Sequence, residues 1–181
     1  MARLVLINGA PGSGKSTLAR RYADAHPLML ALDIDVVRGL LGQWLEHPSE
    51  AGIVARRLAL AMAQVHLGSG HDVVVPQFLG RLDFVLELEG LARAVGAEFV
   101  EMVLLSNAAE AAARFGRRSK DSQTQAHRDA QALLQRSGGD LPQMYANLLH
   151  VVSARPSTIR LLTVDGQVDQ AYRDLVAALD G

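Results

Sequence analysis

A glycine-rich stretch near the start of the chain has the residue types needed to bind phosphate. Residues 9–17 read Gly-Ala-Pro-Gly-Ser-Gly-Lys-Ser-Thr and match the pattern G-x-x-x-x-G-K-[ST] at Gly9, Gly14, Lys15 and Ser16. Glycines allow successive N–H groups to turn inward around an anion, and the positive end of a following helix adds to them. Lysine supplies charge to the β- and γ-phosphates, and the serine hydroxyl ligates Mg²⁺.

We therefore expect this phosphate loop to bind a nucleoside triphosphate. Its expected contacts are Gly9, Ala10, Pro11, Gly12, Ser13, Gly14, Lys15, Ser16 and Thr17, with Ser16 as the metal ligand. The flanks fit, because residues 4–7 predict a strand buried on both faces and residues 16–25 have apolar positions at helical spacing. Lys15 is one of only two lysines among 18 Lys and Arg residues, so a lysine stands where this chemistry needs one.

Two carboxylates and an arginine form a second candidate group. Residues 28–35 predict a buried strand that ends in Asp33 and Asp35, and a spacing of two would point both side chains to one face. Asp35 is then a candidate base for an attacking hydroxyl, and Arg38, three residues on, would hold the acceptor or spread phosphoryl charge. Asp33 could reach Mg²⁺ through water. The alternative is a helix cap with a surface ion pair to Arg38.

The elements that must position these groups alternate between strands and helices. Further strands are expected at residues 72–76, 98–105 and 159–164, and helices at 36–45, 51–67, 82–95, 106–118, 142–150 and 168–179. This order predicts one α/β domain over residues 1–181, with a five-stranded parallel sheet flanked by helices in three layers. An arginine-rich stretch near 114–139 lies where a helical lid over the phosphates would be useful.

Composition limits the classes of protein that remain. The net charge of −1 gives no support to nucleic-acid binding, and the absence of cysteine excludes disulfides and a thiolate nucleophile. No apolar run approaches the roughly 18 residues of a membrane helix, and the chain passes from Met1 directly into a strand. We expect a soluble cytoplasmic protein; nothing in the sequence specifies an oligomeric state.

The phosphate loop, followed by Asp35-x-x-Arg38 and by arginines late in the chain, resembles the P-loop kinase group. The chain looks most like the branch that holds polynucleotide 5′-kinases, chloramphenicol phosphotransferase, zeta toxins and tunicamycin-resistance proteins. That resemblance implies a P-loop NTPase fold of the kinase type, ATP and Mg²⁺ as cofactors, and Asp35 facing the acceptor hydroxyl. One departure is that the third strand ends in Pro76-Gln77 with no carboxylate, so Mg²⁺ would depend on Ser16, water and Asp33.

The resemblance also implies roles for residues late in the chain. Arg114 and one of Arg117 and Arg118 would reach over the triphosphate from the lid, although basic residues also favour the last turn of any helix. Asp165 and Gly166, after the fifth strand, would lie against the adenine. The residues expected to contact the acceptor are Asp33, Asp35, Arg38, Trp44, Gln77 and Phe78.

Three functions follow from these patterns. The first is an ATP- and Mg²⁺-dependent kinase that phosphorylates a hydroxyl of a small molecule, either a metabolite or an antibiotic. The second is a polynucleotide 5′-kinase, which fits Asp-x-x-Arg but is disfavoured by the near-neutral charge. The third is a nucleotide-dependent switch or binding module, disfavoured because no switch carboxylate follows the third strand.

Overall fold

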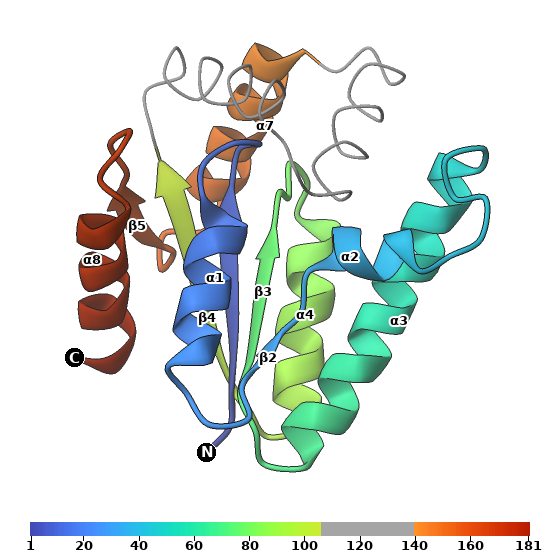
Figure 1. Ribbon diagram of the computed structural model, residues 1–181, viewed down its shortest axis with the longest axis horizontal. Coiled ribbons are helices and arrows are strands. Elements are labelled where there is room, and N and C mark those ends of the chain that lie inside the picture. The colour runs from blue at the N-terminus through green and yellow to red at the C-terminus, as the bar shows by residue number, and fades with distance from the viewer. Residues whose placement is uncertain (106–139) are drawn as a thin grey trace.

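The computed structural model describes residues 1–105 and 140–181, and these residues build one parallel sheet with helices on both faces (Figure 1). The strand order is β2-β3-β1-β4-β5, so the strand that leads into the phosphate loop is central. The strands are β1 (Arg3–Gly9), β2 (Leu30–Ala31), β3 (Val73–Gln77), β4 (Glu98–Leu105) and β5 (Ile159–Leu162). The helices are α1 (Lys15–Asp24), α2 (Ile34–Gly39), α3 (Pro48–Gly68), α4 (Asp83–Ala94), α7 (Leu141–Ser153) and α8 (Val168–Asp180).

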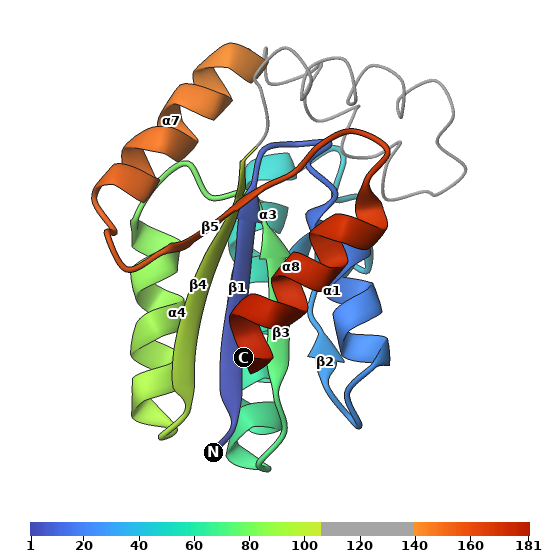
Figure 2. The same ribbon diagram turned by 90° about the vertical axis from the view of Figure 1, so that its left-hand side faces the viewer.

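The expected three-layer α/β fold is confirmed. Successive side chains of a strand point to opposite faces, so the continuous apolar runs of β1 and β3 bury both faces of the sheet. One core cluster joins alternate residues of these strands to α2, α3 and α4, and a second joins the remaining residues to α1 and α8. Figure 2 shows the sheet nearly edge-on, with α4 and α8 on opposite faces.

A third, smaller cluster places α7 against the phosphate loop. Leu148 and Val152 of α7 pack with Ala10 and with Val103 of β4. Just after α7, the Arg155 guanidinium lies 2.9 Å from a Glu89 carboxylate oxygen on α4 and 2.5 Å from one of Glu101 on β4. Helix α7 is therefore tied to both the core and the loop.

The prediction of a strand over residues 28–35 was wrong at both ends: Leu28 has a φ of 58°, and the carboxyl end is replaced by a helix. Only Leu30–Ala31 pair with β3, and helix α2 begins at Ile34. The physical reason is the cap: a carboxylate oxygen of Asp33 accepts a hydrogen bond from the Asp35 N–H at 3.0 Å. This bond gives a partner to an N–H group that the first turn of a helix leaves free. The cap therefore favours the start of a helix over an extension of the strand.

The helix expected over residues 36–45 also ends early, at Gly39. The backbone then turns through residues 40–47, and Gln43 has a φ of 53°, which a helix interior does not allow. Leu40 is 79 % exposed after the helix ends, whereas Trp44 is 8 % exposed. The remaining predicted elements outside 106–139 are confirmed, apart from small shifts at their ends. The predicted lid and the helix at 106–118 lie outside the described residues.

Candidate functional site

The phosphate loop connects β1 to α1 at the carboxyl edge of the sheet. Gly12 and Gly14 have φ values of 82° and 92°, a backbone region that favours glycine. A Cβ at Gly9 would lie 2.6 Å from the Ser13 hydroxyl, so this position also requires glycine. Ser13 is only 3 % exposed and its hydroxyl has no hydrogen-bond partner. A buried hydroxyl with no partner inside a ring of backbone amides fits a phosphate oxygen as its missing partner.

Asn8, the last residue before the loop, is a functional residue that the sequence interpretation missed. It is 1 % exposed. Its carbonyl oxygen accepts from the Gly9 N–H at 2.8 Å and the Leu79 N–H at 2.9 Å, and its amide donates to the Leu79 carbonyl at 3.1 Å. Asn8 thus joins the start of the phosphate loop to the segment after β3. A polar residue closing an otherwise apolar strand was the available signal.

Asp33 connects the phosphate loop to α2. A carboxylate oxygen of Asp33 accepts a hydrogen bond from the Asp35 N–H at 3.0 Å, and Ser16 and Lys15 of the loop are near enough to lower its pKa. Burial raises the pKa of Asp33, and the neighbouring Asp35 raises it further, against the lowering effect of the Ser16 and backbone hydrogen bonds. Two oxygen donors, one hydroxyl and one carboxylate, therefore meet beside the loop.

This donor set fits Mg²⁺, which takes oxygen ligands and keeps several waters rather than requiring a full protein cage. Among residues 1–105 and 140–181, no group of three or more His, Cys, Asp or Glu side chains is placed to hold a metal ion. Ser16 and Asp33 would therefore hold the ion together with phosphate oxygens. Gln77, the last residue of β3, offers an amide in place of a carboxylate.

Asp35, Arg38 and Trp44 form a stack on the other side of Asp33. The Arg38 Nη2 lies 3.1 Å from Asp35 Oδ1, and the two side chains are 15 % and 35 % exposed. The guanidinium carbon lies 4.9 Å from the centre of the Trp44 ring. Arg38 is held between a carboxylate below its edge and an aromatic face, which fixes its orientation.

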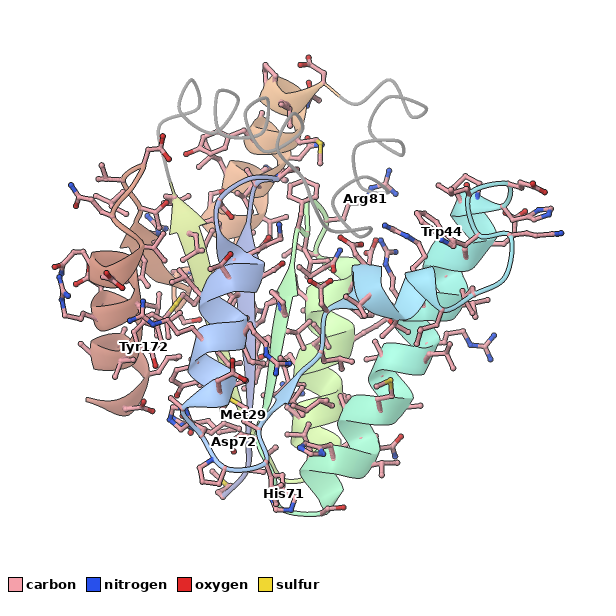
Figure 3. The ribbon with its side chains drawn as sticks, in the orientation of Figure 1. Met29, Trp44, His71, Asp72, Arg81 and Tyr172 are labelled. Atoms are coloured by element: carbon pink, nitrogen blue, oxygen red, sulfur yellow. The ribbon has the colours of Figure 1, made fainter. Side chains whose placement is uncertain are left out.

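The segment after β3 contributes Gln77, Phe78 and Arg81. Gln77 Oε1 is buried with no hydrogen-bond partner. Phe78 packs in the small cluster with Ala10 and Leu148, so its ring supports the phosphate loop as well as bordering the site. Arg81, which the sequence interpretation passed over, is exposed and extends above the carboxyl edge of the sheet, the same edge where Trp44 lies (Figure 3). Met29, His71 and Asp72 lie at the opposite edge.

A cavity lies between the phosphate loop and the segment that follows β5. Its walls are Ser13, Gly14, Thr17 and Leu18 on one side and residues 163–168 with Ala171 on the other. Asp165 and Gly166 are therefore at this cavity, and Gly166 has a φ of 77°. Arg114, Arg117 and Arg118 lie outside the described residues.

Comparison with known proteins agrees with this geometry. A family model described as an AAA domain matches residues 4–137, and the chain belongs to this family. Comparison with curated proteins gives no match. Among the described residues, no helix is both long and apolar enough to cross a membrane.

Three solved structures share the fold. The tunicamycin resistance protein of Deinococcus radiodurans has 15 % identity and a TM-score of 0.63, covering 99 % of this chain and 96 % of that one. The APS kinase CysC of Mycobacterium tuberculosis, in complex with AMPPNP and APS, has 18 % identity and a TM-score of 0.64, covering 99 % and 98 %. Kti12 of Chaetomium thermophilum, in complex with ADP-AlF3, has 17 % identity and a TM-score of 0.61, covering 98 % and 100 %. The fold is that of the P-loop kinases.

Proposed function

We propose that this protein is an ATP- and Mg²⁺-dependent phosphotransferase that moves the γ-phosphoryl group to a hydroxyl of a small molecule. The observation that carries the proposal is the position of Asp33, which lies beside Ser16 and Lys15 of the phosphate loop and accepts a hydrogen bond from the N–H of Asp35. A candidate base is thereby fixed beside the loop that would hold the triphosphate. Proximity of this kind is the main requirement of phosphoryl transfer.

The nucleotide would lie across the phosphate loop, with its base in the cavity next to Asp165 and Gly166. Loop amides and the Ser13 hydroxyl would bond phosphate oxygens, and Lys15 would place its charge on the β- and γ-phosphates. Mg²⁺, held by Ser16 and Asp33, would neutralise charge on the β- and γ-phosphate oxygens. Arg114 and one of Arg117 and Arg118 are proposed to add positive charge there.

The residues of the acceptor side, meaning α2, residues 40–47 and the end of β3, would orient the hydroxyl. Its oxygen forms a bond to the γ-phosphorus while the bond from that phosphorus to the β–γ bridging oxygen breaks, and ADP leaves with the electron pair. The hydroxyl proton passes to the Asp35 carboxylate. Arg38, oriented by Trp44 and paired with Asp35, would hold the acceptor and offset the developing negative charge.

The tunicamycin resistance protein and the APS kinase among the neighbours support an acceptor of small size, because their names refer to an antibiotic and to APS. A net charge of −1 gives no electrostatic footprint for an oligonucleotide. We therefore place a metabolite or antibiotic ahead of a polynucleotide end.

The test combines ATP binding with an acceptor screen. Calorimetry with Mg²⁺-ATP should show binding by the natural protein and a loss of at least about 10-fold in affinity for Lys15→Ala, because a charge-assisted contact is removed. ADP release should then be measured with each compound of a panel of hydroxylated metabolites, antibiotics and 5′-hydroxyl oligonucleotides. We expect it only when one class of these acceptors is added. Binding of ATP without transfer to any of them would contradict the proposal, and transfer only to oligonucleotides would redirect it.

A further inference from the structure

Five side-chain atoms within residues 1–105 and 140–181 are buried with no hydrogen-bond partner. One, the Ser13 hydroxyl, belongs to the phosphate loop, and those of Glu101 and Thr158 lie on β4 and just before β5. The other two, Arg38 Nε and Gln77 Oε1, both belong to the acceptor side. A buried polar atom without a partner is costly, so each of these two atoms needs a bonding partner that the described residues do not supply.

The two atoms lie on elements that pack against each other. Ile34 and Val37 of α2 share a core cluster with Val75 of β3, and α2 is in contact with β3. Gln77 is two residues beyond Val75, so its side chain leaves the sheet on the face that α2 covers. Arg38 follows Val37 directly and is 15 % exposed. Both side chains therefore belong to the region where α2 meets the carboxyl end of β3.

The bonding character of the two atoms defines what can fill that space. Nε of a guanidinium can only donate, and the carbonyl oxygen of a glutamine amide can only accept. An anionic oxygen would satisfy Arg38 and leave Gln77 without a donor, and an ammonium group would do the reverse. A hydroxyl, which accepts and donates at once, satisfies both atoms.

The same atoms also define where that hydroxyl lies on the acceptor molecule. Nε and Nη2 are on one edge of the planar guanidinium, and Nη2 is the atom paired with Asp35 at 3.1 Å. A hydroxyl at Nε is therefore next to the carboxylate that would take the proton of the reacting hydroxyl. Resting on the proposed function, we propose that the acceptor is a vicinal diol of the polyol or sugar type. One hydroxyl reacts at Asp35, and its neighbour bonds Arg38 Nε and Gln77 Oε1.

Trp44 allows the diol to be tested without relying on turnover. It is the only tryptophan of the chain, and its ring lies under the guanidinium that would receive the second hydroxyl. Trp44 fluorescence should therefore respond to binding. The probes are matched compounds: a methyl riboside and its 2-deoxy and 3-deoxy counterparts, a hexitol and its deoxy counterparts, and inorganic phosphate and sulfate. Each is titrated into the protein and also assayed for ATP-dependent ADP release.

We expect at least one diol to bind, and to be turned over, about 10- to 100-fold better than both of its deoxy counterparts, since removing the hydroxyl leaves two buried atoms unpaired. Gln77→Leu should raise the KM of the diol, so that the diol and its deoxy counterparts are used about equally well. Gln77→Glu, which keeps an accepting oxygen, should retain the preference for the diol. Gln64→Leu on the exposed face of α3 is the matched control and should change nothing. Calorimetric ATP binding by each variant shows that it is folded.

The outcomes separate the two proposals. Equal use of diol and deoxy compounds with ADP release intact would overturn the diol inference alone, as would a preference that survives Gln77→Leu. If phosphate or sulfate bound more tightly than any diol, the ligand of this site would be an anion, and the diol inference would be overturned. Diol binding reported by Trp44 with no ADP release would instead overturn the phosphotransferase proposal and leave the diol site standing. No fluorescence response and no ADP release would reject both.

Discussion

The nucleotide side and the acceptor side of the site are built in different ways. The nucleotide side, the phosphate loop and residues 163–168, depends on backbone geometry: glycines at positive φ and a Gly9 position that has no room for a Cβ. The acceptor side depends on side chains, with Asp35, Arg38 and Trp44 stacked on one another and Gln77 reaching in from β3. The phosphate loop is a local fold of consecutive residues, whereas the acceptor side joins separate elements.

This difference teaches what each side can recognise. Backbone amides present the same N–H group whatever the residue, so they suit the phosphates that all nucleoside triphosphates share. Side chains differ in charge, shape and bonding, so they suit an acceptor that must be selected from many hydroxyl compounds. Specificity should therefore change with substitutions on the acceptor side while nucleotide affinity stays constant.

The largest expected effect is on turnover, and it comes from substituting Asp35 on the acceptor side. Nucleotide affinity should not change. Asp35→Asn removes the proposed base but keeps an isosteric side chain, so kcat should fall about 10²- to 10⁴-fold with the Kd for ATP unchanged. Asp83→Asn, at the start of α4 and exposed, is the control. Stopped-flow or coupled ADP assays measure the first quantity and calorimetry the second. A variant with near-normal turnover would remove Asp35 from the mechanism.

The next effect tests the backbone character of the nucleotide side. Gly9→Ala adds only a methyl group, yet that carbon would lie 2.6 Å from the Ser13 hydroxyl and 3.3 Å from Leu104 Cβ. We expect the loop to distort and ATP affinity to fall about 10- to 100-fold, since its amides must point at one centre. Gly52→Ala on α3, where the added carbon meets nothing within 4 Å, should leave affinity unchanged. Normal ATP binding by Gly9→Ala would show that the loop tolerates side-chain volume.

A third effect concerns the connection between the two sides. Asn8→Ala leaves the Gly9 N–H and both backbone groups of Leu79 without their partner, so the free energy of unfolding should drop by about 1–3 kcal/mol. Urea denaturation measures this drop, with the exposed Asn147→Ala as control. ATP affinity and acceptor KM should both worsen, because Asn8 holds the loop and the β3 end together. If only one of them changed, the two sides would be independent.

The smallest expected effect is on stability and comes from Asp180, at the edge of the sheet far from the site. It should change neither nucleotide binding nor acceptor binding. Burial alone would raise the pKa of Asp180, but hydrogen bonds from Tyr22 and Arg3 outweigh it and lower that pKa. A carboxyl group with a lowered folded-state pKa stabilises the fold above its unfolded pKa, and this contribution is lost as pH falls through the folded pKa.

Asp180→Asn should therefore reduce the free energy of unfolding at pH 7 by about 0.5–1 kcal/mol, with the difference vanishing in acid below the folded pKa. Thermal or urea unfolding across that pH range gives the measurement, and the exposed Asp83→Asn is its control. A difference that grew toward acid would reverse the assigned sign. Any change in ATP affinity would show that the far edge does influence the site.

Much of the nucleotide side could be predicted from the sequence because it is local. The spacing from Gly9 to Ser16 contains the turn, the lysine and the hydroxyl, and the strand before and helix after it have clear periodicity. The bounds predicted for the fourth strand, 98–105, are those of β4. Helix α3 begins at Pro48, three residues before the predicted start at residue 51, because proline fits the first turn of a helix.

The acceptor side was harder because its features depend on tertiary neighbours. Asp33 could extend a strand or cap a helix, and its proximity to Ser16 and Lys15 depends on how the distant phosphate loop packs. Nothing near Asn8 in sequence identifies Leu79 as its partner, and the buried oxygen of Gln77 exists only because α2 covers it. The roles of Arg114, Arg117 and Arg118 stay predictions.

The turn at residues 40–47 has an engineering consequence. It begins after Gly39 and ends at His47, the N-cap of α3, and it carries the aromatic support of Arg38. For the proposed phosphotransferase, turns of other lengths grafted between α2 and α3 should change which alcohol is accepted and leave ATP binding at the phosphate loop unchanged. A library of variants at this one turn would therefore sample acceptor preference separately from nucleotide binding.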